Sequence, residues 1–373
     1  MNASIANWSE QDDVLSFTLS NVNVSVANAL RRTVLSDIPT VVFRTAPHDK
    51  SKATIEVNTG RLNNEIIKQR LSCVPIHTYG LDIAIQDYIA EINVTNDTSS
   101  LLYVTTKDIR VKNKTTNKYI SEANLRHLFP PHPITNDFII LARLRPRISL
   151  NEEGEALKLT CEFDVGNAKE NGSFNVVSLC AYGNTQDRNA SAIALSKSMK
   201  DAKSDGTSDE DLAILQKNWD HLEGKRYFIK DSYDFAVKSI GVYPNMHILQ
   251  LACLQLKKRI QRFDETLDSA GDDIIQTSES TLNNCFDITM KGEDYTLGKL
   301  LEFIIYDTFY NGKTGTLSYC GFRKPHPHID ESIIRIAFNS EDGISKSDAL
   351  SVMKTSCRKA LDVIEKLTTE LSD

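Results

Sequence analysis

The sequence predicts an α+β fold in which two related modules are joined in one chain and the first is interrupted by an inserted, mostly antiparallel β domain. Three observations predict it: a strand and helix unit near the N-terminus, short alternating strands in the middle, and a C-terminal unit that repeats the order of the first. The expected segments are a first module at 1–80 and 225–266, the inserted β domain at 81–224, a linker at 267–280 and a second module at 281–373.

The composition is that of a globular protein. The chain has 373 residues, of which 40% are hydrophobic and 25% charged, enough for two or three domains with their own cores. Its net charge of -7 argues against a protein whose main task is to coat nucleic acid, since phosphate binding needs an excess of Lys and Arg. No basic leader followed by an apolar run appears, and no segment approaches the roughly 18 apolar residues of a membrane span. We therefore expect a soluble intracellular protein without a membrane partner.

The seven cysteines are far apart and form no C-x-x-C pair. This spacing favours reduced core thiols over a disulfide framework or a zinc ribbon. The sequence therefore predicts no metal site among them.

The first element is a strand at "VLSFTL", residues 14–19, followed by a helix in "VSVANALRRTVLSDIP". Val26, Leu30 and Val34 recur every four residues and form one apolar face, while Arg31 and Arg32 lie on its flank or back. Ser25 is the expected N-cap, and Pro39 ends the helix.

A strand at "ATIEVN" and a helix in "LNNEIIKQRLSCVPIH" complete the N-terminal unit. From about residue 81 the pattern changes to short alternating strands such as "AEINVT", "LLYVTT" and "LKLTCEFDV", which indicates the inserted β domain. Residues 184–211 are polar and rich in small side chains, and we expect them to be mobile, with a capped surface helix after them in "SDEDLAILQKNWDHLEG".

A strand in "YDFAVKSIG" and a long helix from about residue 245 close the first module. The apolar residues of this helix are spaced alternately by four and three, which forms a seam that requires a helical partner. The second module repeats this order with a strand at "NCFDITM", a helix in "GEDYTLGKLLEFIIY", a strand at "SIIRIAF" and a last helix with the same spacing. "SVANAL" aligns with "TLGKLL" by residue type, with Ala27 opposite Gly298.

At these residues the sequence resembles the assembly subunits of multisubunit RNA polymerases. "VSVANALRRTVLSDIPTVVF", "NNEIIKQRLSCVPI" and "AVKSIGVYPNMHILQLACLQLKKRI" are similar to motifs of the bacterial alpha subunit, the archaeal D subunit and the third eukaryotic subunit. "EDYTLGKLLEFIIY" and "CGFRKPHPH" resemble the smaller partner, the archaeal L or eleventh eukaryotic subunit. The resemblance implies a non-catalytic platform on which the largest and second-largest polymerase subunits assemble, together with small subunits.

The resemblance also implies which residues act. Arg31 and Arg32 would face the second-largest subunit, and Lys169, Glu170 and Phe174 match a family loop that touches the second-largest and small subunits. Asn171 and Val176 depart from the family pattern in that loop, and Tyr295 and Lys299 depart from it in the second module. Only Cys161 and Cys180 stand in the insert, where some relatives hold a metal through four cysteines, so no metal or cofactor is expected. The implied module-pairing core consists of Val26, Leu30, Val34, Leu249, Leu256, Ile260, Leu297, Leu301, Leu350, Met353 and Ile364.

Joining the two modules in one chain resembles the fused assembly subunit of nucleocytoplasmic large DNA viruses. This resemblance implies a viral protein of the virion and the infected host cytoplasm, with the nucleus as an alternative. Because the two seams can cover each other, we expect a monomer rather than a homodimer.

Two other functions are weighed against this interpretation. Cys320, His326 and His328 are close enough in sequence to suggest a zinc enzyme, but a fourth ligand and the common catalytic motifs are absent. A nucleic-acid-binding transcription adaptor would need a basic face, for which Arg143, Arg145 and Arg147 are the compact candidates. The acidic net charge disfavours the adaptor, and we expect no sequence-specific nucleic-acid binding.

Overall fold

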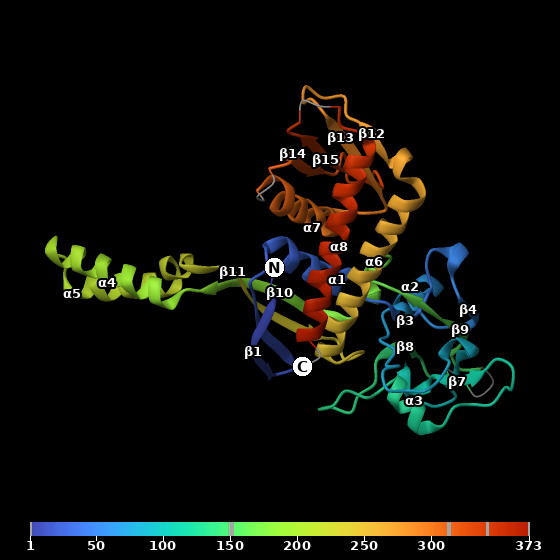
Figure 1. Ribbon diagram of the computed structural model, residues 1–373. Coiled ribbons are helices and arrows are strands. Elements are labelled where there is room, and N and C mark those ends of the chain that lie inside the picture. The colour runs from blue at the N-terminus through green and yellow to red at the C-terminus, as the bar shows by residue number, and fades with distance from the viewer. Residues whose placement is uncertain (1, 148, 150–152, 312–314, 341–342, 372–373) are drawn as a thin grey trace. The chain divides into compact units, whose positions relative to one another are not determined.

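The computed structural model describes residues 2–147, 149, 153–311, 315–340 and 343–371 (Figure 1). It is a mixed α+β structure built on antiparallel strand pairs, which confirms the α+β part of the predicted fold class. The chain divides into two compact units, one formed by 1–33, 179–238 and 249–373 and the other by 34–178 and 239–248.

The first unit contains an N-terminal sheet of four strands. Their order is β1 (Ser4–Gln11), β2 (Val14–Ser20), β11 (Phe228–Ser239) and β10 (Val177–Gln186). Asp12 and Asp13 both have positive φ and form the two-residue turn that joins β1 to β2, as the right-handed twist of a hairpin favours. The buried face of this sheet includes Phe17 and Phe235, whose rings stack with centroids 5.0 Å apart.

A second four-stranded sheet in the same unit is built from the C-terminal part of the chain. Its order is β12 (Ile275–Thr277), β13 (Cys285–Lys291), β15 (Glu331–Phe338) and β14 (Leu317–Arg323). Ile334 and Ile336 are fully buried on β15, while Ile333 and Arg335 between and before them are only half-buried, the pattern of a strand with one face on a core.

Four helices pack with these two sheets, as Figure 1 shows. They are α1 (Val24–Ser36), α6 (Asn245–Ile274), α7 (Tyr295–Ile305, continued by one π-helical segment at Tyr306–Tyr310) and α8 (Lys346–Glu370). Two further helices, α4 (Arg188–Ser204) and α5 (Asp209–His221), stand between β10 and β11 and are followed by a 3-10 turn at Glu223–Arg226.

Helices α6 and α8 run side by side in opposite directions. Residues later in α6 contact residues earlier in the C-terminal segment that contains α8. Gln250 donates a hydrogen bond to the carbonyl of Leu371, Lys257 pairs with Glu365, and Asp268 pairs with Lys354. Along this part of α6 the seam residues Leu249, Cys253, Leu256 and Ile260 are at most 1% exposed. Such burial of apolar side chains is the main source of stability in helix pairs.

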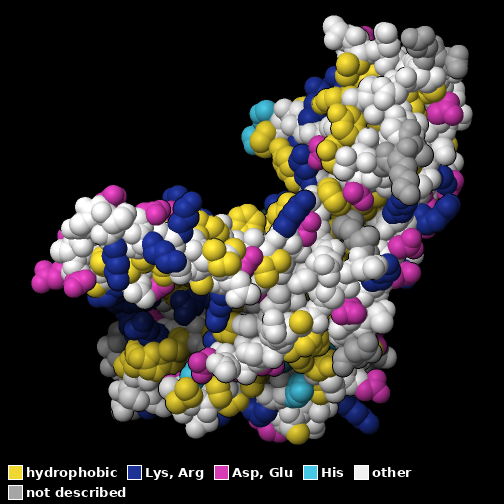
Figure 2. All heavy atoms as spheres, turned by 60° about the vertical axis from the view of Figure 1, so that its left-hand side comes forward, with side chains coloured by type: hydrophobic (Ala, Val, Ile, Leu, Met, Phe, Trp, Pro, Cys, Tyr) yellow, Lys and Arg dark blue, Asp and Glu magenta, His cyan; other side chains and the backbone are white. Residues whose placement is uncertain are grey.

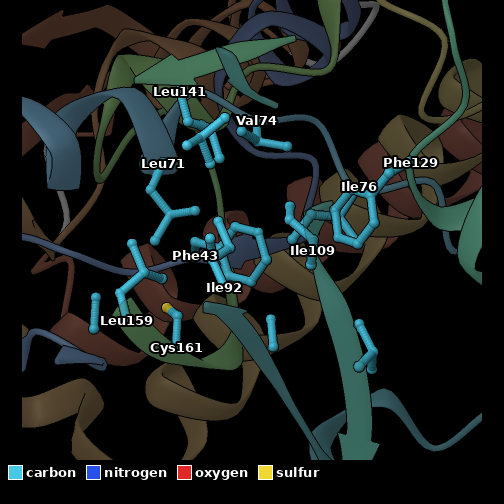
Figure 3. Packing of buried hydrophobic residues seen from close by; sticks show 14 of the residues in the cluster. Phe43, Leu71, Val74, Ile76, Ile92, Ile109, Phe129, Leu141, Leu159 and Cys161 are labelled. Carbon is cyan, nitrogen blue, oxygen red and sulfur yellow. The ribbon is translucent and has the colours of Figure 1, made fainter. Parts of the chain in front are cut away.

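The second unit is an antiparallel β structure with two short helices, α2 (Asn64–Ser72) and α3 (Glu122–Leu128). Its main sheet has the order β3 (Thr40–Phe43), β9 (Ala156–Gly166), β5 (Tyr88–Thr95) and β7 (Arg110–Asn113), with β4 (Ala53–Asn58) also paired to β9. β6 (Leu102–Thr105) and β8 (Ile140–Leu144) form a separate pair, and 3-10 turns lie at His48–Lys50, Ile85–Asp87, Thr106–Asp108 and Gly172–Phe174. Figure 3 shows side chains of several of these elements converging in one core, among them Phe43, Leu71, Ile92 and Leu159.

The compact units differ from the segments expected for the insert. β3 and α2, expected in the first module, place Phe43, Ile67 and Leu71 in the core of the second unit. β10 and the segment up to residue 224, expected in the insert, belong to the first unit because β10 pairs with β11. Residues 188–204, expected to be mobile, form α4, which Asp187 caps by accepting a hydrogen bond from the Ala190 amide.

Most of the segment expected to be a linker, 267–280, is helix and strand. α6 continues to Ile274, with a non-helical residue at Ala270, and β12 follows at once. Ile275 is 1% exposed and Leu267 is equally buried, so apolar burial holds a segment whose polar composition suggests a loop. The opening helix also starts earlier than expected, because Asn23, not Ser25, caps it: the Asn23 carboxamide oxygen accepts from the Ser25 amide at 2.9 Å.

Among the described helices, none combines the length and the apolar character that crossing a bilayer would need.

Candidate subunit interface

Helix α1 separates an apolar face from two arginines. Val26, Leu30 and Val34 are at most 1% exposed, while Arg31 and Arg32 are half-buried beside that face. The periodicity of four places the three apolar residues on one side of the helix and the guanidinium groups elsewhere. The two arginines have different surroundings.

Arg32 is held by the start of α7. Its Nε donates to the Thr296 hydroxyl at 2.9 Å, and its Nη2 lies 3.2 Å from a carboxylate oxygen of Asp294. Asp294 is also the N-cap of α7, because its other oxygen accepts from the Thr296 amide at 2.9 Å. Arg32 therefore joins α1 to the N-cap of α7, whose residues lie more than 260 positions away in the chain.

A second arginine approaches the same carboxylate from α6. Arg259 forms a nearly buried ion pair with Glu293, with side chains only 11% and 10% exposed, and its Nε lies 3.1 Å from the Glu293 carboxylate. Its Nη2 is also 3.4 Å from Asp294. Burial opposes the ionised form of Asp294, but the hydrogen bonds from Thr296 and the charges of Arg259 and Arg32 outweigh it and lower the pKa of this carboxyl to about 2. We call Arg32, Arg259, Glu293, Asp294 and Thr296 the arginine–carboxylate cluster.

Arg31 has no such anchor. Its Nε and Nη2 both lie 3.3 Å from the Asn28 side-chain oxygen, one turn earlier on α1, and the described part of the chain offers its guanidinium no carboxylate. The nearby Tyr182 is half-buried, which raises the pKa of its hydroxyl, and the positive charge of Arg31 opposes that rise. Of the two arginines on α1, Arg31 is therefore the one whose charge remains uncompensated.

The loop with Lys169, Glu170 and Phe174 is organised by Arg44, a residue that the sequence did not single out. Arg44 lies just after β3 and binds Asp164 at 2.6 Å, Glu170 at 2.9 Å and the Val165 carbonyl at 2.9 Å. Its guanidinium carbon also lies 5.7 Å from the centre of the Phe174 ring. Nothing around "VVFRTA" marks this arginine, because its partners come from a strand 120 residues away.

Within this loop, Lys169 and Glu170 are exposed but Phe174 is only 2% exposed. The aromatic ring packs beneath Arg44 and against Gly166, where a Cβ would lie 2.8 Å from it. Phe174 therefore supports the loop from inside, and the surface it offers a partner consists of its neighbours. The Lys169 amide fixes the loop further by donating to the Ser36 carbonyl at 2.9 Å.

The residues expected in the module-pairing core are all buried except one. Leu297, Leu301, Met353 and Ile364 are inaccessible to solvent, like their counterparts on α1 and α6. Leu350 is half-buried and lies next to Gly271 of α6, where a Cβ would be 3.3 Å from the leucine methyl.

The residues considered for a metal do not converge. Within the described ranges no group of three or more His, Cys, Asp or Glu side chains could hold an ion. His326 and His328 stack edge to face with ring centres 5.0 Å apart, while the Cys320 thiol points to the Glu302 carbonyl. Burial raises the pKa of Cys161, Cys180, Cys253, Cys320 and Cys357 to about 12, so these thiols stay protonated at neutral pH and are poor ligands.

Comparison with known proteins gives one family and several relatives. The family described as RNA polymerase Rpb3/Rpb11 dimerisation domain matches residues 16–260. The chain is 42% identical over 66 residues to DNA-directed RNA polymerases IV and V subunit 3B of Arabidopsis thaliana, a match that spans 18% of each chain. It is 23% identical over 280 residues to DNA-directed RNA polymerase subunit Rpo3 of Pyrococcus furiosus, covering 68% of this chain and 93% of the archaeal one. It is 27% identical over 223 residues to DNA-directed RNA polymerases I and III subunit rpac1 of Dictyostelium discoideum, covering 54% and 56%.

Proposed function

Because the chain belongs to the RNA polymerase Rpb3/Rpb11 dimerisation-domain family, we propose that it is a non-catalytic assembly subunit of a multisubunit DNA-directed RNA polymerase. The matched relatives carry the names of polymerase subunits, and one archaeal relative is covered almost completely. The family match over 16–260 is the observation that carries the proposal.

The chain would supply two pairing modules instead of one. The N-terminal sheet order β1-β2-β11-β10 has the same form as the C-terminal order β12-β13-β15-β14, with α1 following β2 as α7 follows β13, and α6 following β11 as α8 follows β15. This correspondence supports two copies of one fold, the first interrupted by the insert between α1 and β10. The family match ends at residue 260 and so does not cover the second copy, which is therefore proposed from the order of strands and helices.

The two proposed modules would be held together by apolar and ionic contacts. The antiparallel α6 and α8 pair covers both helical seams, and the arginine–carboxylate cluster ties α1 and α6 to the start of α7. Covalent joining turns the encounter of two chains into an intramolecular step with a high effective concentration. Because the seams are already covered, the proposal includes a monomeric isolated chain.

The platform would bind the two largest polymerase subunits. Arg31, whose charge has no carboxylate partner in the described structure, and the exposed Lys169 and Glu170 are the proposed contacts to the second-largest subunit. A planar guanidinium suits such an interface because it can bind a carboxylate or two carbonyls at once. The joined arrangement supports a source in a large DNA virus, with the enzyme working in the virion or the infected cell.

The competing function, a nucleic-acid-binding adaptor, has less support. Figure 2 shows Lys and Arg side chains spread over one face among acidic and apolar ones, without one continuous basic stripe. The net charge of -7 is also unfavourable for phosphate binding.

Affinity capture of the tagged chain from its native source, followed by mass spectrometry, tests the assembly role. We expect two very large polypeptides to be recovered in amounts equal to the tagged chain. Recovery of the chain alone, or with nucleic acid but without large polypeptides, would contradict the proposal.

A further inference from the structure

The second unit contains a pocket in which arginines surround an apolar floor. Its volume is about 450 Å³, within the range of roughly 300–1,000 Å³ that is usual for ligand sites. Apolar side chains from the segments just before α2 and just before β6, and from β8, line it together with four arginines. The lining residues are Arg61, Leu62, Arg70, Leu101, Ile140, Leu141, Ala142, Arg143 and Arg145.

Three of the arginines are positioned by the fold. Arg70, in the last turn of α2, donates from Nη2 to the Ile140 carbonyl at 2.7 Å. Arg143 on β8 lies opposite Tyr103 on β6, with its guanidinium carbon 5.9 Å from the ring centre. The Glu155 carboxylate accepts two hydrogen bonds from Arg145, one from the Arg145 Nε at 2.5 Å and one from the Arg145 backbone amide at 2.6 Å.

The positive charge of the pocket is only partly compensated. Glu155 neutralises Arg145, and for Arg61, Arg70 and Arg143 the described part of the chain supplies no ion pair. Like charges gathered at one concavity repel one another, and their combined potential attracts an anionic ligand. The protein as a whole has a net charge of -7, so this group of arginines is a local feature of the surface. Its position at a pocket indicates a role in binding.

The floor of the pocket defines the ligand further. Leu101 and Ile140 are 44% and 40% exposed, so apolar surface lies open next to the arginines. A sugar–phosphate backbone would satisfy the charges but leave this apolar surface uncovered. A peptide that alternates carboxylate and apolar side chains satisfies both, because guanidinium groups bind carboxylates bidentately while leucine or phenylalanine side chains bury apolar area.

We propose that this pocket binds an acidic, apolar peptide segment of a partner polypeptide. The inference goes beyond the assembly role, because it depends on the pocket alone and does not require that the partner be a polymerase subunit. Arg61, Arg70 and Arg143 would bind the carboxylates, and Leu101 and Ile140 would contact the apolar side chains.

The test uses the full-length chain and fluorescence anisotropy with a labelled peptide that alternates Glu with Leu and Phe. Comparison probes are a peptide in which Ser replaces the apolar residues, a single-stranded oligonucleotide and inorganic pyrophosphate. The variants are Arg61→Glu with Arg143→Glu, Leu101→Ser, and a matched control with two exposed arginines of α6 and α8 reversed, Arg262→Glu with Arg358→Glu. Circular dichroism of each variant checks that it is folded.

We expect the Glu/Leu/Phe peptide to bind in a salt-dependent manner, and its affinity to fall by about tenfold or more in the pocket double variant but not in the control. Leu101→Ser should lower the affinity for the Glu/Leu/Phe peptide and leave the lower affinity for the Ser-containing peptide unchanged. Three results would overturn the proposal. The first is that the peptide shows no salt-sensitive binding, and the second is that both peptides bind equally, which would indicate a simple anion site. The third is that the oligonucleotide binds more tightly than the peptide and displaces it.

Discussion

Asp294 has a strongly lowered pKa within the arginine–carboxylate cluster. Its pKa of about 2, against an ordinary 3.8, means that the folded state holds the ionised form more tightly than the unfolded state does. A depressed carboxyl pKa stabilises the fold above the unfolded value, and that stabilisation disappears as the pH falls from about 4 to about 2. The difference corresponds to about 2 kcal/mol at neutral pH.

We therefore expect Asp294→Asn to lower the free energy of unfolding by about 2 kcal/mol at pH 7, and the deficit to vanish near pH 2. Urea unfolding at a series of pH values measures it. Asp362→Asn, which changes an exposed carboxylate on α8, is the matched control and should show little deficit at any pH. A deficit for Asp294→Asn that does not change with pH would show that lost packing, not charge, is responsible.

We predict that Arg31 contacts a partner subunit, whereas Arg32 binds residues of its own chain. Arg31→Glu should leave the melting temperature within a few degrees of the wild type, because the side chain is half-exposed and its hydrogen bonds within the described residues go to Asn28, but should reduce recovery of the second-largest polypeptide by about tenfold. Co-purification from cells that express the variant measures this. Arg358→Glu serves as the control for charge alone, and equal recovery with both variants would contradict a role for Arg31.

At the scale of elements, the start of α7 depends on a glycine. A Cβ at Gly298 would lie 2.0 Å from the Phe322 ring of β14, so this helix approaches the sheet more closely than any side chain allows. Glycine to alanine in a helix normally stabilises by up to about 1 kcal/mol. Here we expect the opposite sign, a loss of roughly 1–3 kcal/mol from overpacking.

Chemical denaturation of Gly298→Ala measures this change. Phe322→Leu in the same background should restore part of the loss, because it removes the ring atoms that the new methyl group meets. Stabilisation by Gly298→Ala alone would mean that the close approach of α7 to β14 is not a constraint.

The elements differ in how well the sequence predicts them. α1, α2, α6, α7 and α8 carry regular apolar spacing, which survives in any tertiary setting and was predictable. α4 has almost no apolar face, with Ser191 its single buried residue, so periodicity could not distinguish it from a loop. The end of α6 and β12 are held by burial of Ile274 and Ile275 within a polar stretch, and only the three-dimensional packing shows this.

Some features of the candidate site could also be predicted from the sequence, and others depend on the fold. Arg31 and Arg32 stand out because they interrupt an apolar helix, and their helical position follows from spacing. The pairing of Arg32 with Asp294, and of Arg44 with Asp164 and Glu170, joins residues far apart in sequence and could not be predicted without the fold. The burial of Phe174 likewise depends on Arg44 and Gly166 closing over the ring.

At the scale of the whole molecule, the covered seams predict that the isolated chain is a monomer. Leu249, Leu256, Ile260, Met353 and Ile364 are buried within one copy, so the helical seams formed by these described residues are already covered. Sedimentation equilibrium at micromolar concentration should give a mass near 41.8 kDa. A stable species of twice that mass would indicate that the modules pair between chains.

The claim that one chain supplies both pairing modules is tested most directly by native mass spectrometry of the assembled polymerase, which counts the copies of each polypeptide. We predict one copy of this chain for each copy of the two large polypeptides, with no separate small chain of the Rpb11 type in the assembly. Two copies of this chain, or one copy accompanied by a separate chain of that type, would contradict the claim.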